Sequence, residues 1–202
     1  MAEQNRVGVF GGTFNPIHVA HLVLAQAALE KLHLQQVIFM PAGQPPHKRS
    51  QTDLAPAEHR HRMVQLAIAD NPQFTVSRFE IDFPGPCYTI HTLEALERDL
   101  GPETELILLV GGDWAGQIRH WYQGDKILSR YSIATAGRGN GNSQPDSHTC
   151  IDMPMMDLSS SMIREHIRAG KSIRYLVPES VFEYIHTHRL YEDAAFSRDK
   201  VD

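Results

Sequence analysis

The chain has 202 residues, which suits one domain of ordinary size, and its 42% hydrophobic and 21% charged residues are typical of a globular protein rather than a disordered one. A formal net charge of -5 argues against general nucleic-acid binding, which usually requires a basic surface. The two cysteines, Cys87 and Cys150, have no metal-binding or redox spacing, the first residues form no apolar signal region, and no apolar run could span a bilayer. We therefore expect a soluble, cytoplasmic protein without nucleic-acid or membrane partners.

In the first half of the chain, short apolar runs that end at glycine or proline predict strands, and apolar residues at helical spacing predict helices. The predicted strands are 6–10, 37–40 and 74–81, and the predicted helices are 19–32, 58–69 and 88–100. The proline-containing segment 44–57 is predicted to be a loop, and its length suggests a function because long irregular loops are uncommon in compact domains.

The second half continues the alternation of strands and helices. The predicted strands are 106–110, 131–136 and 150–156, the predicted helical segments are 118–128, 159–169 and 179–187, and segment 137–147 is predicted to be a loop. This order predicts an α/β fold: a Rossmann-like doubly wound parallel sheet with helices on both faces. We expect a single domain over residues 1–191 and a polar tail over 192–202. Ligands of such sheets bind at the carboxyl ends of the strands, where the strand order reverses.

Segment 11–21 is the first candidate site. Gly11 and Gly12 follow a predicted strand and let the backbone approach a ligand closely. His18 and His21 are three positions apart near the start of a predicted helix, where free N–H groups and the helix dipole favour phosphate. A glycine pair or a histidine pair alone is usually incidental, but together they predict a phosphate cradle. The segment matches neither the Walker loop nor the dinucleotide fingerprint.

A second candidate anion site follows Asp157. Serines that precede an apolar helical run are ordinarily N-caps, but one capping serine would suffice. Three consecutive serines at 159–161 with Arg164 in the first turns favour phosphate binding by hydroxyl and guanidinium donors.

Other features are less specific on their own. His47 and Lys48 lie in a basic loop that is either solvated or holds a second phosphorylated substrate. Trp121 and Tyr122 either pack in the core or form a stacking surface, and the residues alone leave both alternatives open. A dedicated metal site at the histidine pair lacks a third ligand, so we expect only Mg²⁺ carried in with a nucleotide.

These residues resemble the nucleotidyltransferase superfamily with the (H/T)xGH motif, and more closely the bacterial nicotinate-nucleotide adenylyltransferases. The resemblance covers the chain from Val7 to about Tyr191. It rests on Gly-Gly-Thr-Phe-Asn-Pro-Ile-His, Pro-Pro-His-Lys, Gly-Gly-Asp, Trp-Tyr, Ser-Ser-Ser-Met-Ile-Arg and Tyr-Leu-Val-Pro, in the family's order. It implies an enzyme of NAD biosynthesis that transfers an adenylyl group from ATP, with Mg²⁺, to nicotinate mononucleotide, giving deamido-NAD and pyrophosphate.

The resemblance also implies roles for individual residues. The implied catalytic residues are His18, His21 and Arg164. The implied ATP-binding residues are Gly11, Gly12, Thr13, Phe14, Gly111, Asp113, Ser160, Ser161 and Ile163, with Gly111 and Asp113 along the ribose and Ser160 with Arg164 at the β- and γ-phosphates. The implied acceptor-binding residues are His47 and Lys48 at the mononucleotide phosphate, Trp121 stacked on the pyridine ring, and Thr89, Ile90 and Tyr122 around its carboxylate.

Two residues depart from the family pattern. Ala20 replaces the usual glycine between the histidines, and Asn15 stands where the family often has aspartate, so we expect a turn-forming role rather than a charge role for that side chain. Alternatives for the activity are a nicotinamide mononucleotide or phosphopantetheine adenylyltransferase and a non-catalytic ATP-binding regulator. The sequence does not determine oligomeric state, and a homo-oligomer is left open.

Overall fold

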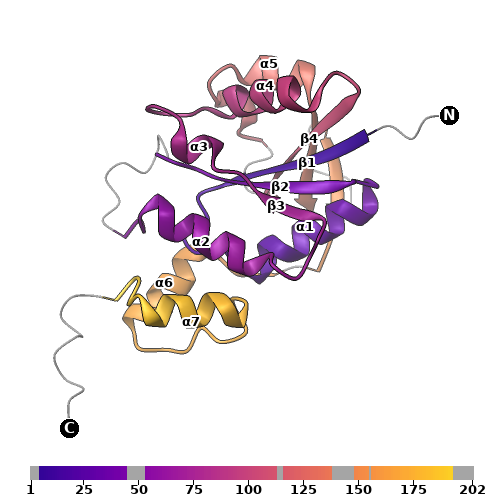
Figure 1. Ribbon diagram of the computed structural model, residues 1–202. Coiled ribbons are helices and arrows are strands. Elements are labelled where there is room, and N and C mark those ends of the chain that lie inside the picture. The colour runs from indigo at the N-terminus through magenta and orange to yellow at the C-terminus, as the bar shows by residue number, and fades with distance from the viewer. Residues whose placement is uncertain (1–4, 45–52, 113–115, 138–147, 155, 193–202) are drawn as a thin grey trace, which may run out of the picture.

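A sheet of parallel strands forms the centre of the molecule (Figure 1). The computed structural model describes residues 5–44, 53–112, 116–137, 148–154 and 156–192. Its strands are β1 (Asn5–Gly12), β2 (Gln36–Pro41), β3 (Phe74–Val76), β4 (Thr104–Val110), β5 (Ser132–Gly137) and β6 (His148–Asp152). They lie in the order β3-β2-β1-β4-β5-β6. Every described pairing is parallel, so the predicted sheet type is confirmed.

Helices cover both faces of this sheet, as predicted. They are α1 (Val19–Lys31), α2 (Ala57–Ala67), α3 (Phe79–Asp82), α4 (Thr89–Leu100), the 3-10 helix η2 (Ile118–His120), α5 (Gly124–Arg130), α6 (Ser160–Arg168) and α7 (Glu179–Thr187). In Figure 1, α1, α2, α6 and α7 lie on one side of the sheet and α3, α4 and α5 on the other. The fold is therefore doubly wound and Rossmann-like. Within the described residues, no helix has the length and apolar character that crossing a bilayer requires.

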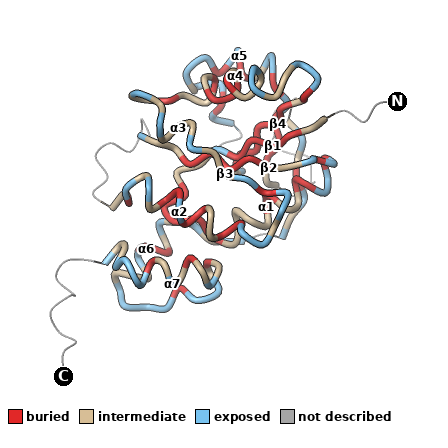
Figure 2. The backbone as a smooth tube through the Cα atoms, in the orientation of Figure 1, coloured by how far each residue is buried: buried red, intermediate tan, exposed pale blue. Residues whose placement is uncertain are grey.

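Alternating side chains of the central strands supply two separate cores. In β1, Val7 and Val9 belong to the core with α4 and α5, whereas Phe10 belongs to the core with α1, α2, α6 and α7. In β4, Leu108 and Leu109 divide in the same way. Figure 2 shows the resulting band of buried backbone through the sheet. Because both faces are covered, the central parts of these strands, 7–10 in β1 and 106–110 in β4, are apolar.

The strand order reverses between β1 and β4. β1 pairs with β2 on one side, with Gly11 opposite Met40, and with β4 on the other, with Phe10 opposite Leu109. The connections that leave β1 and β4 therefore run in opposite directions at the carboxyl edge of the sheet, which is where ligands of such sheets usually bind. The glycine turns at Gly11 and Gly111 lie at this edge.

Three predicted elements differ from the structure by more than a shift of one or two residues at an end. The predicted strand 74–81 is wrong in its second half, because β3 ends at Val76 and 79–82 is the helix α3. Ser77 accounts for the change: its Oγ accepts from the Phe79 amide at 3.1 Å and starts a turn. The predicted strand 150–156 is displaced, since β6 spans His148–Asp152.

The predicted helical segment 118–128 is two short helices rather than one. Gln123, between η2 and α5, has a φ of +53°, which breaks the helical path. Gly124 follows, and a Cβ there would lie 2.1 Å from the Ile118 carbonyl oxygen. The absence of a side chain at Gly124 therefore allows α5 to approach η2 closely.

Candidate active site

Gly11 and Gly12 end β1, and they differ in what surrounds them. A Cβ at Gly12 would lie 2.9 Å from the ring of Phe14. Phe14 is buried, and its backbone has a φ of +48°. A Cβ at Gly11 would meet nothing within 4 Å. Packing within the protein therefore accounts for glycine at position 12 only. Position 11 is exposed and leaves room for a ligand at the carboxyl edge.

Arg60 fixes the turn that follows these glycines. Its guanidinium donates to the carbonyl oxygens of Thr13 at 2.8 Å, Ala55 at 2.9 Å and Gly43 at 3.0 Å. The side chain is almost completely buried, with a relative exposure of 1%. Buried polar groups are stable only when they are hydrogen-bonded, and here one cation satisfies three carbonyl groups. Arg60 thus ties the Thr13 turn to the loop after β2.

His18 and His21 lie together at the start of α1. His18 is the N-cap, and its ring stacks on that of His21 with centroids 3.7 Å apart. The His18 amide donates to His21 Nδ1 at 3.2 Å, so Nδ1 carries a lone pair and the proton of the neutral ring is assigned to Nε2. His18 Nδ1 is buried and makes no hydrogen bond to the described residues. The pair thus offers polar groups that the protein itself does not use.

Both imidazoles are held in the neutral form. Burial lowers the pKa of His18 to about 4. Burial also lowers the pKa of His21, and the neighbouring charge on a protonated His18 would lower it further. At neutral pH the two rings are therefore uncharged N–H donors. The positive charge that a polyanionic ligand requires must come from other residues.

Each of the three serines at the start of α6 has a different role. Ser159 caps the helix, since its Oγ accepts from the Met162 amide at 3.2 Å. Ser160 donates to the Pro16 carbonyl at 2.8 Å and so joins α6 to the segment that carries the histidines. Ser161 is exposed and receives a long contact of 3.4 Å from Arg164 Nη2. Ile163 is buried in the core and its amide bonds the Ser159 carbonyl.

Arg164 is a buried link between α6 and the cradle. Its Nη1 donates to the Asn15 carbonyl at 2.9 Å, and its Nε donates to the Asp53 carboxylate at 2.8 Å. Asn15 is itself buried: its Nδ2 donates to the Asp53 carbonyl, and its Oδ1 accepts from the Ala55 amide and the Tyr191 hydroxyl. Asparagine can both donate and accept, and aspartate at this position could not make the same set of bonds.

The site residues predicted at the acceptor side lie partly at the start of α4. Thr89 and Ile90 are its first two residues, and the Tyr88 N-cap provides no side-chain cap. The Ile90 side chain is fully buried. Tyr122 is half exposed, and its ring lies 4.5 Å from that of Tyr88. Trp121 is partly buried against the core on the α4 side. The structure thus brings Tyr122 to the N-terminus of α4.

The remaining predicted residues belong to the end of β4 and to two segments outside the described ranges. Gly111 follows β4 directly, and at Gly112 a Cβ would lie 2.8 Å from the Ala136 carbonyl oxygen, so this turn packs against β5. His47, Lys48 and Asp113 lie outside the described residues. The described residues contain no group of three or more His, Cys, Asp or Glu side chains arranged to hold a metal ion.

Comparisons with known proteins agree with this geometry. A family model described as cytidylyltransferase-like matches residues 9–166. A probable nicotinate-nucleotide adenylyltransferase from Synechococcus sp. (strain JA-3-3Ab) is 42% identical, over 95% of this chain and 97% of its own. One from Lachnoclostridium phytofermentans is 38% identical, over 92% and 98%. The chain belongs to the nicotinate-nucleotide adenylyltransferase family.

A solved structure shares the fold of this family member at low identity. Plasmodium falciparum nicotinic acid mononucleotide adenylyltransferase, complexed with NaAD, has a TM-score of 0.74 at 19% identity, covering 93% of this chain and 97% of its own. This likeness confirms the fold expected from the sequence, and the curated relatives and the family model confirm the family resemblance.

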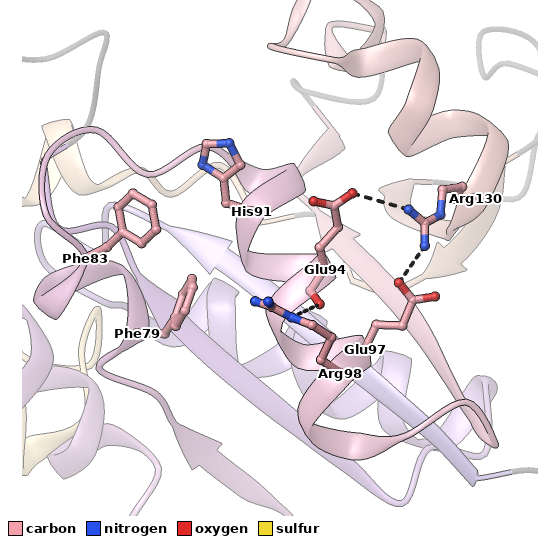
Figure 3. A pocket seen from close by; sticks show the side chains of 7 residues that line it. All are labelled: Phe79, Phe83, His91, Glu94, Glu97, Arg98 and Arg130. Carbon is pink, nitrogen blue, oxygen red and sulfur yellow. Dashed lines mark hydrogen bonds and ion pairs between the residues drawn. The ribbon is translucent and has the colours of Figure 1, made fainter.

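A groove beside α4 is lined by none of the residues that the sequence predicted to bind ATP or the acceptor. It has a volume of about 460 Å³ and is lined by Phe79, Phe83, His91, Glu94, Glu97, Arg98 and Arg130. Figure 3 shows Arg130 bonded to both Glu94 and Glu97, and Lys126 pairs with Glu94 at 2.6 Å. Its carboxylates are thus already neutralised. The groove contains no residue that the sequence assigned to either substrate.

Sequence reasoning missed the residues that hold this family member's cradle in place. Arg60, Asp53 and Tyr191 are each bonded to the Thr13–Asn15 turn or to Arg164 across 38 or more positions of chain. A basic residue on a helix or a carboxylate in a loop has no local pattern that marks such contacts. The only sequence feature near Asp53 was the proline-containing segment 44–57, which was predicted to be a functional loop.

Proposed function

We propose that this protein transfers the adenylyl group of ATP to nicotinate mononucleotide, forming deamido-NAD and releasing pyrophosphate. One observation carries the proposal: the neutral His18–His21 pair, at the start of α1, lies beside the start of α6 at the edge where the strand order reverses. Helix N-termini and imidazole N–H groups suit a triphosphate. Relatives about 40% identical carry the name of this activity.

The reaction needs no protein nucleophile. The mononucleotide phosphate attacks the α-phosphorus of ATP in line, the new P–O bond forms, and the bond to the β-phosphate oxygen breaks as pyrophosphate leaves. Both reactants are anions, so the protein's work is positioning and charge neutralisation. Gly11 leaves space for phosphate, His21 Nε2–H donates to a phosphate oxygen, and Arg164 supplies positive charge. Mg²⁺, held chiefly by the nucleotide's phosphates, would neutralise further charge when bound.

The start of α4 favours an acidic pyridine ring over its amide. The Tyr88 carbonyl accepts from the His91 amide, and Tyr88 supplies no side-chain cap to the first turn. The amides of Thr89 and Ile90 would therefore be available to a carboxylate, which the helix dipole also stabilises. Tyr122 and Trp121 would flank the ring. His47 and Lys48 are proposed at the mononucleotide phosphate, Gly111 and Asp113 at the ATP ribose.

A single assay tests the activity. The protein is incubated with ATP, Mg²⁺ and either nicotinate mononucleotide, its amide analogue or phosphopantetheine, and released pyrophosphate is measured. We expect the highest kcat/KM with nicotinate mononucleotide. ATP binding without pyrophosphate release would favour a regulator, and faster release with the amide would reassign the acceptor.

The location of the protein and its assembly are further proposals. Cys87 and Cys150 are both free thiols, which fits a reducing compartment such as the cytoplasm. The net charge of -5 fits small nucleotides, rather than nucleic acid, as partners. A homo-oligomer is compatible with the fold and is tested by sedimentation.

A further inference from the structure

Asp53, just before α2, joins two arginines of α6 through one carboxylate oxygen. Its Oδ2 accepts from Arg164 Nε at 2.8 Å and from Arg168 Nη2 at 2.9 Å. The side chains of Arg164 and Asp53 are only 7% and 24% exposed. In the ion pair of Arg78 and Asp82 the corresponding values are 43% and 60%, so the Asp53 contacts are much better shielded and fix geometry more firmly.

Asp53 also sets the charge of this cluster. Burial raises the pKa of the Asp53 carboxyl, but hydrogen bonds from Arg164 and Arg168 and their charges outweigh burial and hold the pKa below its usual value. Asp53 is therefore ionised at neutral pH. Two guanidinium groups and one carboxylate leave one net positive charge beside the cradle. Without the carboxylate, the two arginines would repel each other and Arg164 would lose its acceptor at Nε.

The contacts of Arg164 leave part of its guanidinium unused. Of the five N–H donors of an arginine, one at Nε is directed to Asp53, one at Nη1 to the Asn15 carbonyl, and one at Nη2 to Ser161 Oγ. Among the described residues, no partner takes the other two N–H groups. Because Asn15 belongs to the turn that carries the cradle, the guanidinium is held against that turn while two donors remain for an anion.

We propose that Asp53 is a positioning residue for adenylyl transfer: it holds the Arg164 guanidinium in the orientation that leaves two N–H groups for the nucleotide phosphates. The inference rests on the proposed function. Asp53 could affect the reaction through its negative charge alone or by positioning Arg164, and these two roles predict different results for its removal. Removing a carboxylate near a polyanion should strengthen ATP binding, whereas releasing the arginine should slow the reaction whatever happens to ATP affinity.

The variant Asp53→Asn separates these effects, because it keeps the shape of the side chain and leaves the backbone bond from Asn15 Nδ2 to the Asp53 carbonyl in place. We expect kcat for pyrophosphate release to fall roughly tenfold or more, as for a displaced catalytic group. The Kd for ATP, measured by calorimetry, should not rise in proportion. Asp82→Asn, at the exposed ion pair with Arg78, is the matched control and should leave both values unchanged.

Two further variants show whether Asp53 acts through Arg164. Asp53→Glu keeps the charge but moves the carboxylate by one methylene, and it should also lower kcat. Adding Asp53→Asn to Arg164→Lys should cost little beyond Arg164→Lys alone, because coupled residues are not additive. An unchanged kcat in Asp53→Asn, or full additivity in the double variant, would overturn the proposal.

A spectroscopic measurement keeps the inference separate from the proposed activity. If the wild-type protein releases no pyrophosphate with any acceptor, the proposed function fails. The ¹⁵N-resolved Nε–H signal of Arg164 still tests Asp53 in that case. A signal that is sharp in the wild type and shifted or lost in Asp53→Asn supports the positioning role, and an identical signal in both proteins overturns it.

Discussion

His21 carries its proton on Nε2, because its Nδ1 accepts the His18 amide at 3.2 Å. The ring is therefore a neutral donor whose orientation is fixed by the backbone of its own helix start. In the proposed reaction, such a preorganised donor would stabilise the charge that develops on phosphate oxygens without having to reorient. The same hydrogen bond explains why the histidines are three positions apart: the spacing lets the second ring reach back to the amide of the first.

We expect His21→Ala to lower kcat by roughly 10²-fold, about 3 kcal/mol, because one transition-state donor is lost. The His21 ring contacts Phe14 at 5.1 Å and Phe10 at 5.9 Å between centroids, so the variant loses these contacts. The fold should survive, because Phe10, Phe14 and Phe39 still contact one another. Steady-state pyrophosphate release gives the rate, and circular dichroism checks the fold. A rate equal to that of the wild type would remove His21 from the mechanism.

His18 makes the stability of the protein depend on pH. Its pKa is about 4 in the folded state and 6.5 as the reference for the unfolded chain, so the unfolded state binds the extra proton between these values. The contribution is complete above pH 6.5 and is lost as pH falls towards 4. At about 1.36 kcal/mol per pH unit, we expect a loss of about 3 kcal/mol.

Urea unfolding at several pH values between 4 and 7 measures this loss. The variant His18→Asn should show a shallower dependence than the wild type, whereas the same substitution at the exposed His33 should leave the dependence unchanged. If the free energy of unfolding depends on pH equally in His18→Asn and the wild type, the burial of His18 does not contribute to this dependence.

Residues with a local signature could be identified from the sequence, and residues without one could not. Gly11, His18 and His21 lie in one segment whose composition predicts a phosphate site. Asp53 and Arg60 act through several hydrogen bonds with backbone or side-chain groups that are mostly distant in the sequence. Such contacts depend on the folded arrangement of three loops, which no periodicity or composition encodes.

At the scale of elements, the strongest periodic segments were predicted within a few residues and the short ones were not. The segment 74–81 is apolar enough for a strand, yet hydrogen bonding by Ser77 and the pairing of Arg78 with Asp82 at 2.9 Å stabilise a helical turn instead. A three-residue strand and a four-residue helix bury too little to show a clear period. Tertiary contacts therefore decide such elements.

The two glycines that end β1 form a matched pair for testing the turn. Gly12→Ala places a methyl group about 3 Å from the Phe14 ring, and such overpacking should destabilise the protein by about 1–3 kcal/mol. Gly11→Ala meets nothing within 4 Å, so its melting temperature should stay that of the wild type. If Gly11 borders the phosphates, its variant should instead raise the KM for ATP. A lower melting temperature for Gly11→Ala together with an unchanged KM for ATP would place the ligand elsewhere.

At the scale of the whole molecule, alternating apolar strands and amphipathic helices predicted the doubly wound sheet, and the glycine turns after its strands predicted the edge where the candidate site lies. Chain order could not predict how distant parts close the site. Asn15, Asp53, Arg164 and Tyr191 meet in one hydrogen-bonded cluster although up to 176 positions separate them. The cluster joins the first turn of the sheet to Tyr191, so the segment after α7 is part of the framework of the candidate site.

This framework predicts where the chain can be shortened. Leu190 and Tyr191 pack on the core beside α1 and α7, and the Tyr191 hydroxyl donates to Asn15 Oδ1 at 2.9 Å. A protein that ends at Glu192 keeps these contacts and is the reference for the shorter chain. A protein that ends at Arg189 loses the side chains of Leu190 and Tyr191. Its free energy of unfolding should fall by about 2–3 kcal/mol, equivalent to about 4–12 °C in melting temperature.

Tyr191→Phe removes only the hydrogen bond to Asn15 and should cost about 1 kcal/mol. Calorimetric melting of the four proteins distinguishes these contributions, and equal melting temperatures for the two shortened chains would show that the C-terminal contacts do not stabilise the fold.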